Sequence, residues 1–294
     1  LVDSLKTKVL KLFEYFQDFK NEDGLLENLD GWIMIEWSQA NDFVQDVNYP
    51  TNMLYAGALA AAGRIYDLPE LRSEAEKIKE VIREQSFQDR FFVDNAIRNN
   101  GKLIPQGNTT EVCQYYAMFF EIATKATHTE LWDLLLNKFG PNRDDTLVFP
   151  KVYKANDFIG NYLRLELLSR YNETSQLQQE LVDYFYYMAE KTGTLWEHQG
   201  DYASCNHGFA SHVVHSLYRD LLGIYKIDPD NKMITLKFGE NNLEYCQGMI
   251  PVAEGIELEW RQEEGMIYYE VEKPAEYEIK IVNESEKKLK KIGK

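Results

Sequence analysis

The spacing of apolar residues changes at Gly223. Before that position, apolar residues recur every three to four positions over long segments, which is the period of an amphipathic helix. After it, apolar and polar residues alternate, as they do in half-buried strands. The chain has 294 residues, enough for one large domain and one small one. The sequence therefore predicts a helical domain over residues 1–224 and a β domain over residues 225–283.

The first part of the chain contains a series of paired helical segments without a fixed repeat length. The segment 49–66 is rich in alanine, which suits close packing, and Pro50 suits the first turn of a helix. Helices are expected over residues 2–19, 49–66, 71–85, 109–123, 129–139, 156–171, 175–190 and 206–222. This pattern favours a mainly α fold of the (α/α)6-barrel type, a toroid that is incomplete at its N-terminus, with a helical bundle as the alternative.

Strand signals occur in two places. Asn99-Asn100-Gly101 stands between the short apolar runs Phe91-Phe92-Val93 and Lys102-Leu103-Ile104 and predicts a β-hairpin. The second part of the chain predicts a small antiparallel, β-sandwich-like domain, with strands within residues 226–238, 255–260, 266–272 and 277–282. Residues 284–294 are rich in lysine and are expected to form a disordered basic tail.

Composition excludes several classes of function. The formal net charge of −16 argues against binding to nucleic acid or to anionic membranes. No apolar run approaches the roughly 20 residues that a membrane span requires. The three cysteines are an odd number without a Cys-x-x-Cys spacing, so neither a disulfide framework nor a zinc site is expected. No nucleotide-binding or metalloprotease motif is present, and we expect no cofactor and no metal.

Two short polar segments near the end of the helical part indicate carbohydrate chemistry. Thr194-Leu195-Trp196-Glu197 is followed by Ser204-Cys205-Asn206-His207. A glycosidase requires a carboxylate that activates water, an aromatic face for the sugar ring and polar groups for its hydroxyls. A single glutamate among 48 acidic residues is more often a surface group, but its neighbours make Glu197 a candidate.

These segments resemble the C-terminal catalytic motif of the bacterial α-L-rhamnosidases, an inverting glycoside hydrolase family. In that family the Thr-x-Trp-Glu segment supplies the general base, and the Ser-x-Asn-His segment lines the sugar pocket. The resemblance extends from about Gly24 to Gly223 and continues weakly into the β domain. It implies that Glu197 is the general base for hydrolysis of terminal α-L-rhamnosyl residues. It also implies that Trp196, Asn206 and His207 bind substrate, with a buried structural role as the alternative for His207.

A second segment resembles the family's Gly-Asp-Trp segment. It runs from Asp30 through Trp32 to Trp37, with Glu36 where an aspartate is usual. The resemblance implies that Trp37 is an aromatic wall of the pocket and that Glu36 binds a hydroxyl group. Asp42 is expected either to bind a hydroxyl group or to cap the helix that begins at Tyr49, and Trp32 either lines the site or belongs to the core.

The general acid of the family lies upstream, in an acidic-arginine segment that residues 1–30 do not contain. We therefore expect the chain to be the C-terminal portion of a longer enzyme. The alternatives are a different inverting glycosidase on the same fold, an inactive carbohydrate-binding relative, and a purely structural helical protein. The resemblance implies a soluble bacterial protein of the cytoplasm or periplasm with a rhamnoside as partner, while the oligomeric state stays open.

Overall fold

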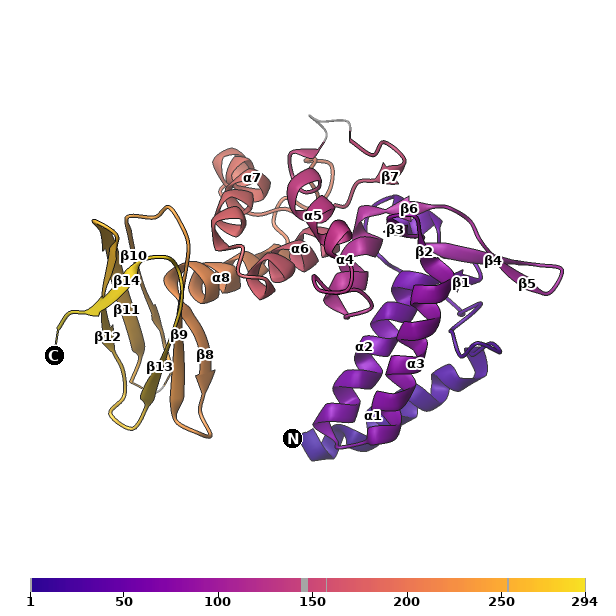
Figure 1. The fold of residues 1–294 in the computed structure, drawn as a ribbon, viewed down its shortest axis with the longest axis horizontal. Coiled ribbons are helices and arrows are strands. Elements are labelled where there is room, and N and C mark those ends of the chain that lie inside the picture. Colours follow the sequence, from indigo (N-terminus) through magenta and orange to yellow (C-terminus); the bar gives the residue numbers. More distant parts are fainter. Residues whose placement is uncertain (1, 144–147, 157, 253, 294) are drawn as a thin grey trace. The chain divides into compact units, whose positions relative to one another are not determined.

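The computed structural model describes residues 2–143, 148–156, 158–252 and 254–293 (Figure 1). The chain divides into two compact units, Leu1–Arg164 and Leu165–Lys294, which we call the first and the second unit. The division lies inside helix α6 (Ile159–Arg170). Each unit is described by itself.

The helices of the first unit match the predicted segments closely. Helices α2 (Tyr49–Ile65) and α3 (Pro69–Ser86) lie side by side, and α1 (Val2–Phe16) lies beside α2 (Figure 1). Phe16 of α1 contacts the ring of Tyr55 of α2 at a centroid distance of 5.6 Å. The unit also contains α4 (Glu111–Phe119) and α5 (Thr129–Lys138).

The predicted hairpin is present, but its first strand begins later than expected. Strand β4 (Asn95–Asn99) pairs with β5 (Lys102–Pro105) and with β1 (Val47–Asn48). Asn100 and Gly101 both have positive φ, as this tight turn requires. Phe91 and Phe92 form β3, which instead pairs with β2 (Phe87–Gln88). A further short pair joins β6 (Thr109–Thr110) to β7 (Val152–Tyr153).

The second unit begins with helices and continues into strands. Helix α7 (Thr174–Thr192) ends at Gly193, which adopts a left-handed conformation with φ of 71°. The expected helix over residues 206–222 is not continuous. It consists of a 3-10 turn, η4 (Gly208–Ser211), then α8 (His212–Ser216) and a π-helical segment, η5 (Leu217–Leu222). Gly223, with φ of 99°, ends this segment and starts the β domain.

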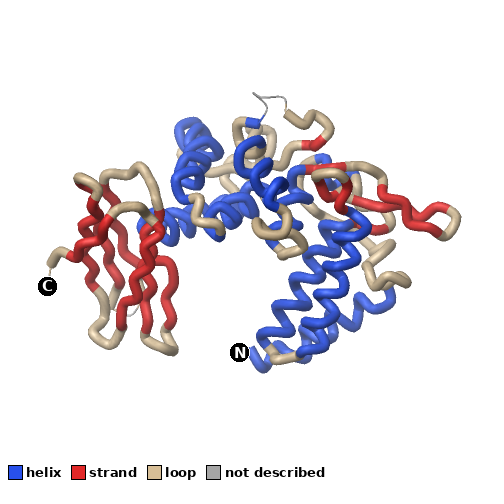
Figure 2. Tube along the Cα trace, viewed as in Figure 1, coloured by secondary structure: helices blue, strands red, loops and turns tan. Residues whose placement is uncertain are grey.

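The β domain consists of two sheets that face each other (Figure 2). Side chains of both sheets form one core, which includes Leu236, Leu258 and Trp260. The first sheet has the strand order β10-β11-β12-β14 and the second has the order β13-β9-β8. The strands are β8 (Ile224–Asp228), β9 (Met233–Gly239), β10 (Tyr245–Ile250), β11 (Ile256–Glu263), β12 (Met266–Glu272), β13 (Glu278–Glu284) and β14 (Lys288–Lys291).

Two expectations about the β domain were wrong. The sheets are not purely antiparallel, because β13 runs parallel to β9 and β14 runs parallel to β12. The segment 284–294 is not a disordered tail over its described residues. Its strand β14 completes the edge of the first sheet, Leu289 packs against the core, and Lys287 forms an ion pair with Glu240. Backbone pairing with β12 orders a segment that has few apolar residues of its own.

The change from helix to strand occurs where the sequence placed it, but the compact units do not divide there. Leu222 of η5 is 2% exposed and belongs to the core of the β domain. The indole Nε1 of Trp260 donates a hydrogen bond to the carbonyl oxygen of Leu222 at 2.9 Å. The end of the helical part is therefore packed into the β domain, and the two compact units divide within α6.

Candidate functional site

The residues predicted for the site belong to both units. Glu36, Trp37 and Asp42 lie in the first unit, whereas Trp196, Glu197, Asn206 and His207 lie in the second.

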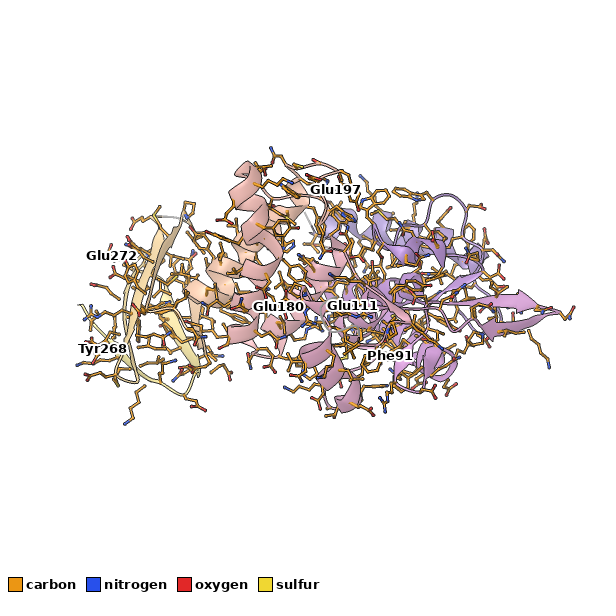
Figure 3. The ribbon with its side chains drawn as sticks, turned by 90° about the horizontal axis from the view of Figure 1, so that it is seen from above. Phe91, Glu111, Glu180, Glu197, Tyr268 and Glu272 are labelled. Carbon is orange, nitrogen blue, oxygen red and sulfur yellow. The ribbon has the colours of Figure 1, made fainter. Side chains whose placement is uncertain are left out.

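A closed loop carries the predicted residues of the second unit. It follows α7 and leads into η4 (Figure 3). The backbone N–H of Glu197 donates to the carbonyl of Ser204 at 2.9 Å, and the N–H of His207 donates to the carbonyl of Leu195 at 3.0 Å. The hydroxyl of Thr194 donates to the carbonyl of Cys205. We call residues 195–207 the motif loop. These hydrogen bonds join the two ends of the loop, so that Glu197 and His207 belong to the same closed loop although ten positions separate them in the sequence.

Trp196, which is predicted to bind substrate, is buried against α7. Its side chain is 2% exposed, and its indole Nε1 donates to the hydroxyl of Thr192 at 2.7 Å. The ring contacts Tyr187 edge-on, with the centroids 5.6 Å apart. These contacts hold the start of the motif loop against α7. The neighbouring Glu197 is half-buried.

His207 has a defined orientation. Its Nδ1 accepts a hydrogen bond from the backbone N–H of Phe209 at 3.2 Å and so caps η4. In the neutral ring this leaves the proton on Nε2, which is therefore a donor. The side chain is half-buried, and the neighbouring Asn206 is exposed. The motif loop thus presents a carboxylate, an amide and an imidazole N–H.

His198 is a neighbour of Glu197 that the sequence analysis did not single out. Its Nδ1 accepts from the backbone N–H of Gly200 at 3.0 Å, and its Nε2 lies within hydrogen-bonding distance of the hydroxyl of Tyr202. Burial lowers the pKa of His198, and the charge of Glu197 opposes that shift. The only sequence signal for this residue was its place directly after the motif.

Glu36, which is predicted to bind a hydroxyl group of the substrate, is fully buried. One oxygen accepts from the N–H of Asn156 at 3.0 Å, and the other accepts from the N–H of Gly160. Burial raises the pKa of Glu36 to about 8, although these hydrogen bonds favour the charged form. A Cβ at Gly160 would lie 2.6 Å from the carboxyl oxygen, so only glycine fits there. Glu36 ties its own segment to the start of α6.

Two tryptophans form an exposed aromatic surface beside this buried glutamate. Trp37 is 42% exposed and Trp32 is 71% exposed, and their ring centroids lie 5.5 Å apart. Trp32 is therefore not a core residue. The backbone here is fixed because the side-chain oxygen of Asn41 accepts from the N–H groups of Ile35 and Glu36, at 2.8 and 3.2 Å. The rigid backbone keeps the rings next to each other.

Asp42 lies in the 3-10 turn η2 (Gln39–Asp42) and does not cap the following helix. Its carboxylate accepts from the side chain of Gln39. The cap of α2 is Asn48, whose side chain accepts from the N–H of Thr51 at 2.9 Å. The capping alternative for Asp42 is thus wrong. Its side chain is exposed and lies near the exposed tryptophans in sequence.

A groove of 530 Å³ lies in the first unit, and Trp32 lines it. Its other walls are mostly apolar or aromatic and come from α1, α2, α4 and the segment before Trp37, with Tyr55 and Tyr116 among them. Asp30 and Thr51 are the polar residues in the lining. Within the described ranges, no group of three or more histidine, cysteine, aspartate or glutamate side chains is placed to hold a metal ion. None of the helices in the described part of the chain has the length and apolar character needed to cross a membrane.

Comparison with solved structures relates this fold to rhamnosidases. A GH78 family rhamnosidase of Bacillus sp. GL1 superposes with a TM-score of 0.84 at 15% identity, over 99% of this chain and 31% of that one. An α-L-rhamnosidase from Dictyoglomus thermophilum gives a TM-score of 0.68 at 13% identity, over 95% of this chain and 32% of that one. A rhamnosidase from Klebsiella oxytoca with rhamnose bound gives 0.54 at 12% identity, over 73% of this chain and 41% of that one.

No protein-family model matches the sequence, and no curated protein matches it. The chain spans between 31% and 41% of the length of these three structures. The structural likeness confirms the resemblance to α-L-rhamnosidases at the level of the fold. It shows that the chain has the fold of a part of these proteins.

Proposed function

We propose that this chain is part of a glycoside hydrolase that cleaves terminal α-L-rhamnosyl linkages with inversion, and that Glu197 is its general base. The observation that carries the proposal is the closed motif loop. Two backbone hydrogen bonds close the loop that carries Glu197 and His207. The indole of Trp196 is hydrogen-bonded to Thr192 at the end of α7. The likeness in fold to three rhamnosidases supports the substrate class.

The chemistry assigned to Glu197 follows from inversion at the anomeric carbon. A water molecule attacks that carbon on the face opposite the leaving group, and Glu197 takes the proton of the water as the new C–O bond forms. The glycosidic C–O bond breaks, and the leaving oxygen receives a proton from a general acid. The two carboxyl groups of such a pair stand about 6.5–9.5 Å apart, which leaves room for the water. We assign no residue of this chain to the acid.

Substrate contacts are proposed for groups that remain accessible. Trp37 offers an indole face to the apolar face and the C6 methyl group of the sugar. Asn206, His207 and Asp42 offer donors and acceptors for hydroxyl groups. Glu36 and Trp196 act as positioning residues, because one is bound to backbone amides and the other is buried against α7.

The test is Glu197→Gln, assayed on a nitrophenyl α-L-rhamnoside. Nitrophenolate leaves readily without protonation, so this substrate reports on the base with little dependence on the general acid. We expect kcat to fall by roughly 10²–10⁴-fold, the usual contribution of a general base. Binding of L-rhamnose, measured by calorimetry, should change little. The matched control is Glu190→Gln at an exposed position of α7.

Each of the following outcomes would reject a part of the proposal. A rate for Glu197→Gln equal to that of the unaltered protein rejects this residue as the base. Hydrolysis of other aryl glycosides but not of the rhamnoside favours a different inverting glycosidase. Binding of rhamnose without turnover favours the inactive carbohydrate-binding relative. Proton NMR of the first product separates the stereochemical courses, because retention of the α configuration rejects inversion.

A further inference from the structure

The β domain carries a groove that no residue of the proposed hydrolytic site lines. It has a volume of 480 Å³ and lies on the sheet of strands β8, β9 and β13. Four cationic side chains line it, which is unusual in a chain with a net charge of −16. The cationic residues of the groove are Arg170, Lys226, Lys237 and Lys280.

Strand register places two of the lysines in one row. Lys226 of β8 is paired with Thr235 of β9, and Thr235 is paired with Lys280 of β13. Paired residues of neighbouring strands lie on the same face of a sheet, about 4.8 Å apart from strand to strand. Lys226 and Lys280 therefore flank Thr235 on one face with about 10 Å between their backbones. Both lysines are exposed.

A third lysine is fixed in the wall of the groove. Lys237 is 8% exposed, its ammonium group donates to the side-chain oxygen of Asn172, and it lies 4.7 Å from the centroid of the Tyr225 ring. Burial lowers the pKa of Lys237, and the charges of Asp220 and Glu284 oppose that shift. This partly desolvated cation adds a short-range positive field beside the two exposed lysines.

The acidic residues of the groove only partly offset these cations. The carboxylate of Asp228 accepts hydrogen bonds from the backbone N–H and the side-chain amide of Asn231, both at 3.0 Å. Its oxygens are therefore bonded within the β8–β9 turn. Glu284 is the other acidic residue in the lining. The groove thus contains four cationic and two anionic side chains.

Apolar surface lies between the charged groups. Tyr225 is 39% exposed, and Met233 and Val282 line the groove with it. An inorganic anion does not need such a surface, and a neutral sugar does not need the cations. A sugar acid uses both, because its C–H face packs on apolar and aromatic side chains while its carboxylate binds ammonium groups.

We propose that this groove binds an anionic oligosaccharide that contains uronic acid residues. Carboxylates of the ligand bind Lys226 and Lys280, and a sugar ring packs against Tyr225. The β domain then holds an acidic glycan through contacts that do not involve Glu197. The proposal stands whether or not the chain hydrolyses rhamnosides.

Binding of trigalacturonate, measured by isothermal titration calorimetry at low ionic strength, tests the proposal. We expect the double variant Lys226→Gln/Lys280→Gln to raise Kd at least tenfold, and added NaCl to weaken binding to the unaltered protein. The methyl ester of the same trisaccharide should bind at least tenfold more weakly. The matched control, Lys288→Gln, removes an exposed lysine from the other sheet and should leave Kd unchanged. Thermal unfolding of each variant verifies that it is folded.

Four results would overturn the proposal. The first three are absence of trigalacturonate binding, equal affinity for the acid and its ester, and equal affinity of the folded double variant and the unaltered protein. Competition by inorganic sulfate at concentrations similar to those of the trisaccharide would also overturn it, because the groove would then be a general anion site. Glu197→Gln should bind trigalacturonate with unchanged Kd, so failure of the hydrolytic proposal remains distinguishable.

Discussion

At the scale of single residues, burial decides which polar groups are available for chemistry. Glu36 and Glu197 are both glutamates beside a tryptophan, yet Glu36 is 0% exposed whereas Glu197 is half-buried in a loop. Burial holds Glu36 in its neutral form at neutral pH, since its pKa is raised to about 8. A neutral, amide-bound carboxyl group acts on the fold rather than on a substrate.

The raised pKa of Glu36 predicts a pH dependence of stability. The folded protein holds a proton that the unfolded chain releases above its ordinary pKa of 4.5. The free energy of unfolding should therefore fall as pH rises from 4.5 to 8, by an amount on the order of 5 kcal/mol at most. In Glu36→Gln this fall should be absent, which urea unfolding between pH 5 and 9 would measure. Glu14→Gln on the exposed part of α1 is the control, and an unchanged pH slope in Glu36→Gln contradicts the prediction.

His212 predicts a pH dependence of the opposite sign. Burial between Phe185 and Phe209 lowers its pKa to about 4, against the charge of Glu166. Its contribution to the free energy of unfolding is complete above pH 6.5 and is lost as pH falls toward 4, by roughly 3 kcal/mol. His212→Gln should remove this loss on acidification, and the exposed His215→Gln should keep it. Equal acid-unfolding midpoints for the two variants would refute the assignment.

At the scale of elements, the ends of helices and the edges of sheets depart more from the sequence-based expectation than the interiors of helices do. The positions of the helices follow from the local spacing of apolar residues, and the helices lie within a few residues of their expected bounds. The segment 206–222 departs from a single helix, because His207 caps a 3-10 turn and η5 follows α8 with π-type bonding. Strand β14 exists because β12 offers it an unpaired edge.

Strand β14 gives a prediction at this scale. Leu289 is its one apolar contact with the core of the β domain, so Leu289→Ser should lower the free energy of unfolding by about 1–2 kcal/mol. Lys290→Ser, at the exposed neighbouring position, is the control and should have little effect. Differential scanning calorimetry measures both. Equal unfolding temperatures of Leu289→Ser and Lys290→Ser would contradict the prediction, because the packing of Leu289 would then add nothing to stability.

At the scale of the whole molecule, the compact units do not coincide with the change in secondary structure. The second unit combines helices and strands because Leu222, at the end of η5, is part of the β core and accepts the hydrogen bond of Trp260. A boundary chosen at residue 224 would cut through this packing.

The unit division predicts the behaviour of two fragments. Residues 165–294 should unfold cooperatively in urea, because they keep Leu222 in the β core. Residues 225–294 lack this side chain and leave the indole N–H of Trp260 without its partner, so they should be less stable by at least about 2–5 kcal/mol. Superimposable unfolding curves for the two fragments would place the boundary after residue 224.

The sequence by itself determined the positions of the long helices, most of the long strands of the β domain, the hairpin turn at Asn100-Gly101 and the segment on which the motif loop lies. These features depend on local periodicity and on the φ values that particular residues tolerate, both of which are properties of neighbouring residues. The tertiary structure decided that Glu36 and Trp196 are buried, that Trp32 is exposed and that β14 is paired. Each of these outcomes depends on groups far away in the chain, such as the amide of Asn156 for Glu36, and residue spacing carries no information about such partners.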